Sequence, residues 1–393
     1  MDTQLPLAGI KVVEHASSVA AAYAGRLLSA MGADVIMVEP PEHNPLRREP
    51  PFLGSDSTVS AVFAYLAVGK RSVICDLRDE DDRVNFDRLV SGAHILIDDT
   101  PVDRRRAIGL DPERIESVHP HLVHLSVLPF GAVGPKAGWQ GCELNLIHAS
   151  GEGFLLPNGL SASLFPDRSP LKIAGHFAEM QGGIAGALSA LSALWAGEGQ
   201  FVDVSVQDAN VAVGAFTVQR YGDGSLEHRV SRSFRYGGVI ECQDGYVELL
   251  TLEERQWLGL VKLMGSPEWA MDEALGDATA RSARGSEINR HIHEWARHER
   301  VDDLVARAQE LGVPMARYNT PEQVLAGKHE AARELFARVP IPGDGTCQIQ
   351  TAPFRFGERP LPVRDWPSEP GADQELLKRG ASRPAGQHQR EDA

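Results

Sequence analysis

Short β-rich runs alternate with helical segments as far as Gly131, and this alternation constrains the fold more than any other feature of the chain. The β-rich runs lie at 10–14, 34–38, 72–77, 94–97 and 122–128. The segments between them carry apolar residues at helical spacing. Strands separated by helices are typical of a parallel sheet covered by helices, so we expect a Rossmann-like, doubly wound α/β domain.

After Gly131 the chain becomes glycine-rich and loop-forming, and a helical segment follows at about 177–195. Gly182, Gly183 and Gly186 lie inside this segment. Each internal glycine costs a helix about 1 kcal/mol relative to alanine. We therefore expect another backbone to pack closely against this helix.

A second, smaller unit begins near Arg235. Candidate strands at 238–242 and 246–250 flank an Asp244-Gly245 turn, which predicts a β-hairpin, and three helical segments follow. This pattern indicates an α+β domain. The residues from about 368 to 393 are rich in Pro, Gly, Arg, Glu and Gln, and we expect them to be disordered or to wrap around a second subunit.

The formal net charge of −15 disfavours nucleic acid as a partner, because a phosphate backbone binds a basic face. Four widely spaced cysteines without a CxxC pair argue against a disulfide scaffold and a zinc site, and they favour a reducing compartment. The sequence shows neither an apolar run of roughly 18 residues nor a signal-peptide pattern. We therefore expect a cytoplasmic protein without a membrane partner.

Several well-known motifs are absent from the sequence: GxGxxG, GxxxxGK(S/T), HExxH and GxSxG. Their absence argues against a nicotinamide dehydrogenase, a P-loop NTPase, a zincin and a serine hydrolase. His119, His121 and His124 have the spacing of metal ligands. They straddle Pro120 and run into a candidate strand, so we expect no metal site.

Clusters of cationic residues lie in loops or near strand ends of the α/β half, where such folds bind ligands. They are Arg47-Arg48, Lys70-Arg71 with Arg78, and Arg104-Arg105-Arg106. One such cluster alone is most simply a solvated surface. Three of them in an acidic chain favour a polyphosphate ligand, whose charges are well matched by guanidinium groups.

Six segments of the chain resemble the family III CoA-transferases. They are PLAGIKVVE (6–14), LLSAMGADVIMVEPP (27–41), GKRS (69–72), FGAVGP (130–135), GQFVDVS (199–205) and GVP (312–314). Each motif is moderately specific, and their order and spacing agree over about residues 5–340. Together they make the resemblance strong.

The resemblance implies a large α/β domain built from both chain ends, which we place at 1–225 and 325–393, and a smaller domain at 226–324. It also implies a homodimer of interlocked subunits, acyl-CoA and carboxylate substrates, and no tightly bound cofactor. Coenzyme A is expected to bind the α/β domain at positions that match the family's contact segments. These positions are Ser18, Val19, Cys75, Arg78, Asp99, Thr100 and Arg106.

The chemistry implied by the resemblance needs an aspartate just before the glycine-rich helix, where it attacks the thioester and forms an anhydride. His176 occupies that position, and an imidazole can act as a base but cannot form the anhydride. Glu179 follows about one helical turn later, and Glu143 keeps a carboxylate that the family places near the thioester. We identify His176, Glu143 and Glu179 as candidate catalytic residues. A helix-capping histidine and a surface glutamate are the alternative interpretations.

Three functions stay open at this stage. The first is transfer of CoA between an acyl-CoA and a carboxylic acid. The second is proton chemistry at the acyl-CoA α-carbon by a racemase, isomerase or lyase; in the related 2-methylacyl-CoA racemases the acid/base pair matches Cys142 and His176 of this sequence. The third is a non-catalytic CoA-ester-binding subunit, because the family's aspartate is missing. The sequence does not identify the acyl or acceptor group.

Overall fold

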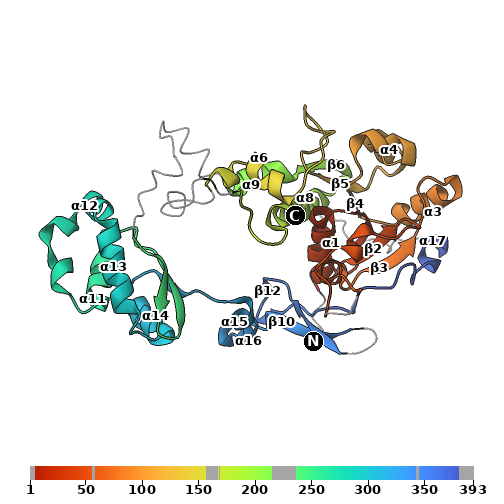
Figure 1. Ribbon diagram of the computed structural model, residues 1–393. Coiled ribbons are helices and arrows are strands. Elements are labelled where there is room, and N and C mark those ends of the chain that lie inside the picture. The colour runs from red at the N-terminus through yellow and green to blue at the C-terminus, as the bar shows by residue number, and fades with distance from the viewer. Residues whose placement is uncertain are drawn as a thin grey trace, which may run out of the picture. The chain divides into compact units, whose positions relative to one another are not determined.

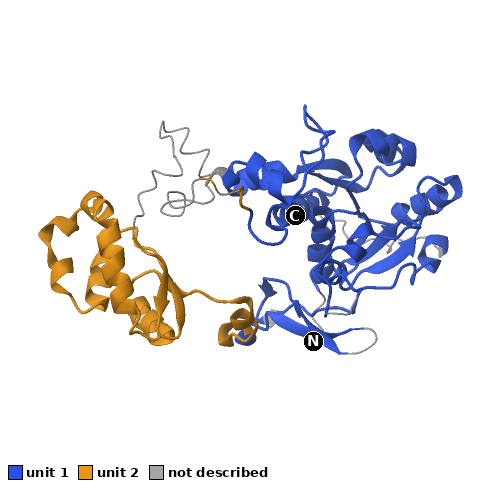
Figure 2. Cartoon of the chain, viewed as in Figure 1, with its two compact units in different colours: residues 1–153, 172–218, 331–393 blue, residues 154–171, 219–330 orange. Residues whose placement is uncertain are grey.

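The chain folds into two compact units. The computed structural model describes residues 5–54, 58–155, 167, 169–214, 236–341 and 345–379. Unit 1 comprises Met1–Gly153, Lys172–Val218 and Ala331–Ala393, and unit 2 comprises Phe154–Leu171 and Gln219–Glu330 (Figure 2). The domain limits expected from the sequence stay a prediction, and the expected boundary at 225 lies outside the described residues.

A six-stranded parallel sheet forms the centre of unit 1, in the order β3-β2-β1-β4-β5-β6 (Figure 1). Its strands are β1 (Lys11–His15), β2 (Asp34–Glu39), β3 (Arg71–Ile74), β4 (Ile95–Asp98), β5 (Val123–Leu128) and β6 (Gln200–Ser205). This order is that of a doubly wound fold, in which the topology reverses between β1 and β4. The fold class expected from the sequence is therefore confirmed, with strand ends that differ by a few residues.

Helices cover the sheet of unit 1. They are α1 (Val19–Ala30), α2 (Ala61–Ala67), α3 (Glu80–Ser91), α4 (Val102–Ile108), α5 (Pro112–Val118), α6 (Glu143–Ala149), α8 (Phe177–Ala196), α9 (Val206–Val213) and α17 (Glu375–Arg379). Helix α1 begins where the Ser18 side chain accepts a hydrogen bond from the Ala21 N–H, as expected of a serine N-cap. Helix α9 begins in the same way, where the Ser205 side chain accepts from the Asp208 N–H.

Helix α8 packs against α1 and α9 at its glycines. A Cβ atom on Gly183 would lie 2.6 Å from the carbonyl oxygen of Ala20, which is backbone of α1. A Cβ atom on Gly182 would lie 2.6 Å from Val206 at the start of α9. Neither position leaves room for a side chain. The expectation that another backbone approaches this helix closely is therefore confirmed.

An ion pair lies buried beneath α1. Lys70 Nζ donates to Glu14 Oε1 and Oε2 at 2.8 and 2.7 Å and to the Ala22 carbonyl oxygen at 2.8 Å. Burial raises the pKa of Glu14 and lowers the pKa of Lys70, since each charge has lost its water. Gly25 makes room for the pair, because a Cβ atom there would lie 1.7 Å from Glu14 Oε2.

The C-terminal segment of unit 1 covers the outer edge of β3. The Gln374 side chain accepts from the Ile74 N–H at 2.8 Å and donates to the Ile74 carbonyl oxygen at 2.7 Å. The Asp373 side chain accepts from the Ser72 N–H, and the Asp373 backbone N–H donates to the Ser72 carbonyl oxygen. The sequence predicts a tail from about 368 that is disordered or wraps around a second subunit, and this stays a prediction. Its described part, to residue 379, makes these bonds and includes α17, and residues 380–393 lie outside the described part.

The remaining strands and helices belong to the end of unit 1 and to unit 2. Two hairpins, β10 (Phe336–Pro340) with β11 (Thr346–Gln350) and β12 (Arg355–Phe356) with β13 (Arg359–Pro360), lie in unit 1.

Unit 2 holds the antiparallel sheet β7 (Gly238–Cys242), β8 (Gly245–Leu249) and β9 (Met315–Arg317). Its main helices are α11 (Glu254–Leu263), α12 (Ala278–Ala283), α13 (Gly285–Ala296) and α14 (Val301–Glu310). The shorter α15 (Pro321–Leu325) and α16 (Lys328–Ala332) follow. The predicted hairpin at 238–250 is thus confirmed. None of the described helices is both long and apolar enough to cross a membrane.

The buried pair gives a prediction about stability. We expect Lys70→Met to reduce the free energy of unfolding by about 3–5 kcal/mol, because Glu14 is left as an unpaired buried charge. Urea unfolding of the full chain measures it. Arg71→Met is the control: it removes a cation whose partner Asp34 is 38% exposed, and it should cost about 1 kcal/mol or less. Equal losses in the two variants would contradict the prediction.

Candidate active site

A cavity of about 340 Å³ opens at the carboxyl ends of β1, β2, β3 and β4. Its wall includes the residues that follow each of these strands, together with one side of α4. The lining residues are His15, Ala16, Ser17, Val38, Pro40, Glu42, Asn44, Pro45, Cys75, Asp76, Leu77, Arg78, Asp99, Thr100, Pro101, Arg104 and Ile108. Ligands of doubly wound folds bind at this edge of the sheet, where the strand order reverses. The cavity is therefore a candidate binding site.

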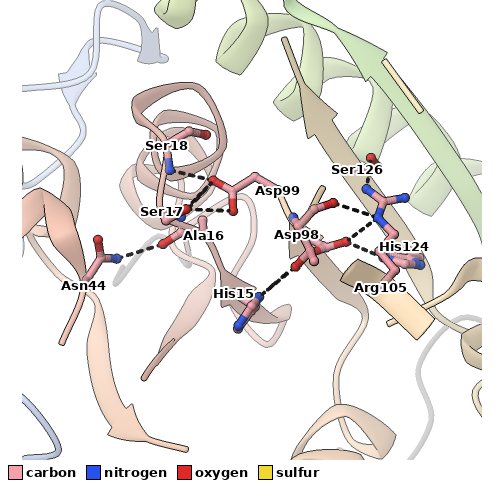
Figure 3. A network of polar contacts seen from close by, with 11 residues as sticks. His15, Ala16, Ser17, Ser18, Asn44, Asp98, Asp99, Arg105, His124 and Ser126 are labelled. Atoms are coloured by element: carbon pink, nitrogen blue, oxygen red, sulfur yellow. Dashed lines mark hydrogen bonds and ion pairs between the residues drawn. The ribbon is translucent and has the colours of Figure 1, made fainter. Parts of the chain in front are cut away.

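The loop between β1 and α1 is fixed on both sides of the cavity (Figure 3). Asp99 Oδ2 accepts from the Ser17 N–H at 2.8 Å and from the Ser18 N–H at 2.5 Å. On the other side Asn44 Nδ2 donates to the Ala16 carbonyl oxygen at 2.8 Å. Burial raises the pKa of Asp99, although its hydrogen bonds from Ser18 and Ser17 oppose the rise. These contacts set the shape of the loop before any ligand arrives.

Asp98 is fully buried beneath the same loop and is surrounded by cationic or protonatable groups (Figure 3). Arg105 Nε lies 3.3 Å from Asp98 Oδ2, His124 Nε2 lies 3.5 Å from it, and His15 Nδ1 lies 3.8 Å from Asp98 Oδ1. Arg105 is held further by Ser126 Oγ at 2.6 Å. Burial acts to raise the pKa of Asp98, but His124, His15 and Arg105 outweigh it and lower the pKa. Asp98 is thus an ionised carboxylate at neutral pH.

The cavity is lined by charges of both signs. Arg78 donates to Asp76 at 2.7 and 2.9 Å and to Glu42 Oε1 at 2.9 Å. Together with Asp99 these make three carboxylates against the two guanidinium groups of Arg78 and Arg104. Within the described part of the chain, no ion pair engages Arg104. It is therefore the lining cation that is open to an anionic ligand.

Most of the predicted cationic clusters serve the fold instead. Arg47 binds the buried Glu39 through two bonds of 2.7 Å, and Lys70 lies in the buried pair described above. Arg71 pairs with Asp34, and Arg105 pairs with Asp98. The interpretation of all three clusters as a polyphosphate site is wrong for these residues, because each is neutralised by a carboxylate on β1, β2 or β4.

The predicted CoA contacts fall partly in the cavity. Four of them line it: Cys75, Arg78, Asp99 and Thr100. Ser18 and Val19 form the N-cap and the first residue of α1, next to the lining residue Ser17, and Arg106 lies on α4 but not among the lining residues. Burial raises the pKa of the Cys75 thiol to about 12, so this group is not a nucleophile at neutral pH.

Sequence reasoning did not identify His15, Ser17 or Asn44 as site residues, and it named Arg104 only as one member of a cationic cluster, although all four line the cavity. The rule that ligands bind beyond the carboxyl ends of strands would have found His15 and Ser17, because they directly follow a predicted strand. Arg104 lies inside a predicted cluster, but only the register of α4 separates it from the buried Arg105.

His176 and Glu179 form a pair at the start of α8. His176 Nδ1 lies 2.8 Å from Glu179 Oε2, and the two side chains are 23% and 18% exposed. His176 is the N-cap residue of α8 but makes no side-chain capping bond. The interpretation of His176 as a mere helix cap is therefore not supported, and its ring instead holds the carboxylate.

Glu143 takes the capping role at the same helix. Its Oε1 accepts from the Ala178 N–H at 2.9 Å and its Oε2 accepts from the Glu179 N–H at 3.1 Å. Only 7% of this residue is exposed. Negative charge is favourable at the amino end of a helix, where N–H groups lack partners. Glu143 thus fixes the backbone beneath Glu179, and its two oxygens are already engaged.

The cavity and the His176–Glu179 pair belong to the same unit and are linked by two helices. The cavity loop runs directly into α1, which lies beside α8 (Figure 1). Gly183 of α8 lies against Ala20 in the first turn of α1. His176 precedes Gly183 by about two turns of helix. The packing of α8 against α1 thus connects the two places within unit 1.

The three histidines with ligand-like spacing have separate surroundings. His119 Nε2 lies 3.5 Å from Asp87, His121 packs edge-on against His119, and His124 lies beside Asp98. Among the residues that the structure describes, no group of three or more His, Cys, Asp or Glu side chains is arranged to hold a metal ion.

Comparison with known proteins gives consistent matches. The family model described as CoA-transferase family III matches residues 7–375. The succinate–glutarate CoA-transferase of Agrobacterium fabrum is 30% identical over 377 residues, which are 91% of this chain and 92% of that protein. The probable CoA-transferase Rv1866 of Mycobacterium tuberculosis is 32% identical over 313 residues; these are 77% of this chain but only 38% of that longer protein. A crystal structure of a CaiB/BaiF family protein from Brucella suis superposes with a TM-score of 0.82 at 28% identity, covering 96% of this chain and 99% of the other.

The environment of Asp98 predicts a pH dependence of stability. Because its pKa is lowered in the folded state, its ionised form stabilises the fold above the unfolded pKa of about 4, and this contribution is lost as the pH falls through the folded value. We expect Asp98→Asn to be less stable than the wild type at pH 7, and the difference to shrink as the pH falls below about 4. Thermal unfolding over this pH range measures it. A difference that is constant from neutral to acid pH would contradict the prediction.

Proposed function

The chain belongs to CoA-transferase family III, enzymes that move coenzyme A between an acyl-CoA thioester and a carboxylic acid, and we propose that Glu179 is the carboxylate that carries the acyl group in this member. The single observation behind this proposal is the His176–Glu179 contact of 2.8 Å at the start of α8. An anhydride needs a carboxylate that can reach the thioester. His176 cannot supply one, and Glu143 has both oxygens bound to backbone N–H groups.

In the proposed reaction Glu179 is the one residue that forms covalent intermediates. A Glu179 oxygen attacks the thioester carbonyl, the C–S bond breaks, and CoA leaves as a thiolate from a mixed anhydride. The thiolate attacks the Glu179 carbonyl of this anhydride, which releases the donor acid as a carboxylate and leaves a glutamyl-CoA thioester. The acceptor carboxylate then attacks the carbonyl of that thioester, the C–S bond breaks, and CoA leaves again as a thiolate from a second anhydride. The thiolate attacks the acceptor carbonyl, which gives the new acyl-CoA and restores Glu179.

In this proposal His176 is a positioning residue. Its Nδ1 holds Glu179 Oε2, so the other carboxylate oxygen can be presented to the thioester. Glu143 holds the backbone of the same residue, as the bond from the Glu179 N–H indicates. Two independent contacts thus limit the motion of the reacting group, which is the condition for an efficient intramolecular step.

We further propose that the cavity at the ends of β1–β4 takes the nucleotide part of CoA, with Cys75, Arg78, Asp99 and Thr100 among its contacts. Arg104 would supply a phosphate contact, because no carboxylate in the described part of the chain engages it. CoA and its thioesters are the substrates, and the proposal needs no tightly bound cofactor.

The acceptor is proposed to be a dicarboxylic acid, with succinyl-CoA as the donor. The similar enzyme of Agrobacterium fabrum is named for succinate and glutarate, and further relatives are named for (R)-benzylsuccinate, D-citramalate and mesaconate. Lys172 supports this choice, since its exposed ammonium group donates to the Gly175 carbonyl oxygen at 2.8 Å, next to His176. A cation there could pair with the second carboxylate of such an acid.

Proton chemistry at the α-carbon is the second candidate function. An imidazole hydrogen-bonded to a carboxylate is a common general base, and His176 has this arrangement. Incubation of an acyl-CoA in heavy water distinguishes the two functions. Transfer without incorporation of deuterium at the α-position would exclude the second function, and incorporation without transfer would exclude the first.

We propose that the enzyme is a cytoplasmic homodimer. Apolar side chains along α8 support a second copy as the occupant: Leu188 is 66% exposed and Trp195 is 80% exposed. The resemblance described above implies that two copies of the chain interlock. The cytoplasm is supported by four free cysteines, because a reducing compartment keeps thiols unpaired.

The dimer proposal predicts that Leu188→Glu lowers the molar mass measured by light scattering toward that of one chain, because a charge replaces an apolar contact. Glu198→Gln, an exposed position just beyond α8, is the matched control and should leave the mass unchanged. A wild-type protein with the mass of a single chain would contradict the dimer.

The proposed carrier gives a direct prediction. Glu179→Gln should lower the rate of CoA transfer from succinyl-CoA by about a thousandfold or more, because an amide cannot form the anhydride. His176→Asn should lower it by about a hundredfold, since Glu179 loses its positioning contact. Mass spectrometry of the wild type under turnover should locate a CoA adduct on the peptide that contains Glu179.

Glu198→Gln serves as the control for both variants, because it makes the same chemical change as Glu179→Gln at an exposed position. Full activity of Glu179→Gln, or a CoA adduct on another carboxylate, would contradict the role of Glu179. Absence of transfer by the wild type with every dicarboxylic acceptor would contradict the proposed substrates.

A further inference from the structure

The two residues just before α1 already bind a carboxylate that belongs to the protein. Asp99 Oδ2 accepts both the Ser17 N–H at 2.8 Å and the Ser18 N–H at 2.5 Å. The Ser17 hydroxyl lies 3.3 Å from the other oxygen, Oδ1. Asp99 directly follows β4, and Ser17 and Ser18 follow β1, so the contact bridges the point where the strand order reverses.

In doubly wound folds the amino end of this helix is a common phosphate-binding position. The amino end of the helix after the first strand carries free N–H groups and the positive end of the helix dipole, and a ligand diphosphate commonly binds there. In this chain the N–H groups of Ser17 and of the N-cap residue Ser18, which lead into that helix, donate to a carboxylate. A phosphate oxygen and the Asp99 carboxylate cannot occupy the same position, and two anions side by side would repel each other.

The other charges of the cavity favour a different position for phosphates. Arg78 neutralises the lining carboxylates of Asp76 and Glu42, so Asp99 is the lining carboxylate that pairs with no cation in the described part of the chain. The part of the cavity beside Asp99 therefore accepts hydrogen bonds rather than anions. Arg104 on α4 is the lining cation without an ion pair in the described part of the chain. Arg78 is 62% exposed, and exposed ion pairs such as its own are weak enough to exchange partners.

We infer that Asp99 determines the specificity and the orientation of the nucleotide, because its carboxylate takes the place of a ligand phosphate at the amino end of α1. The diphosphate then lies at Arg104 and Arg78. The part of the cavity beside Asp99 receives hydrogen-bond donors such as ribose hydroxyls or the adenine amine. This inference rests on the proposed binding of CoA in the cavity. It goes beyond that proposal because it assigns Asp99 an exclusion role that ordinary contact with the ligand would not require.

Titration calorimetry with inorganic pyrophosphate tests the inference on the full chain. Asp99→Ala vacates the two N–H groups, so pyrophosphate should bind this variant about tenfold or more tightly than the wild type, as expected for new charge-assisted hydrogen bonds. Asp99→Asn, which keeps an acceptor but removes the charge, should give a smaller gain. CoA is titrated in parallel with each protein.

Asp103→Ala is the matched control, because it makes the same change on the exposed face of α4 and vacates no N–H group. Its affinity for pyrophosphate should stay within about threefold of the wild type, as expected of a screened surface charge. Equal gains in Asp99→Ala and Asp103→Ala would show an effect of net charge alone and would overturn the inference, as would the absence of any gain in Asp99→Ala.

A second measurement covers the case in which the Asp99 variants do not fold. A crystal structure of the wild type with CoA should place the diphosphate at Arg104 or Arg78. A phosphate oxygen within hydrogen-bond distance of the Ser17 or Ser18 nitrogen would overturn the inference. Failure of the wild type to bind CoA at all would instead contradict the proposed function, since the pyrophosphate comparison does not depend on CoA.

Discussion

The close contact between α8 and α1 is the constraint on which the site depends. At Gly183 the two helices approach so closely that a single added carbon would lie 2.6 Å from a backbone oxygen of α1. Backbone cannot move aside as a flexible side chain can, so the position of α8 along α1 is fixed. That position also sets where His176 and Glu179 lie relative to the cavity loop, which leads into α1. The glycines that would weaken an isolated helix therefore position the two residues that we propose for the reaction.

A carboxylate from another segment of the chain fixes each of the two helices at its amino end. Asp99 accepts N–H groups at the start of α1, and Glu143 accepts N–H groups in the first turn of α8. Each carboxylate comes from a different segment of the chain, so each helix start is tied to a distant element. These two acidic residues shape the site without being free to react. The one candidate carboxylate that remains partly exposed is Glu179, and an imidazole holds it.

Much of the fold could be predicted from the sequence, because strands and helices leave local periodic patterns. The alternation up to Gly131, the hairpin around Asp244-Gly245 and the close packing of α8 all follow from such patterns. Ion-pair partners do not, because they depend on which strands become neighbours. Lys70 was therefore interpreted as a ligand-binding cation, although it meets Glu14 in the core. The different roles of Arg104 and Arg105 could not be predicted either, since Arg104 lines the cavity while its neighbour Arg105 is buried against the sheet.

The covering of β3 by the C-terminal segment has a consequence for the behaviour of the whole protein. An outermost strand offers a row of unpaired N–H and C=O groups that other chains can join, which is a common start of aggregation. Here the Gln374 amide imitates a neighbouring strand at Ile74, and Asp373 does so at Ser72. The sheet is thereby closed to further growth on that side. In a nascent chain Gln374 follows Ile74 by 300 residues, so the open edge of β3 is exposed to self-association until this later segment has been made.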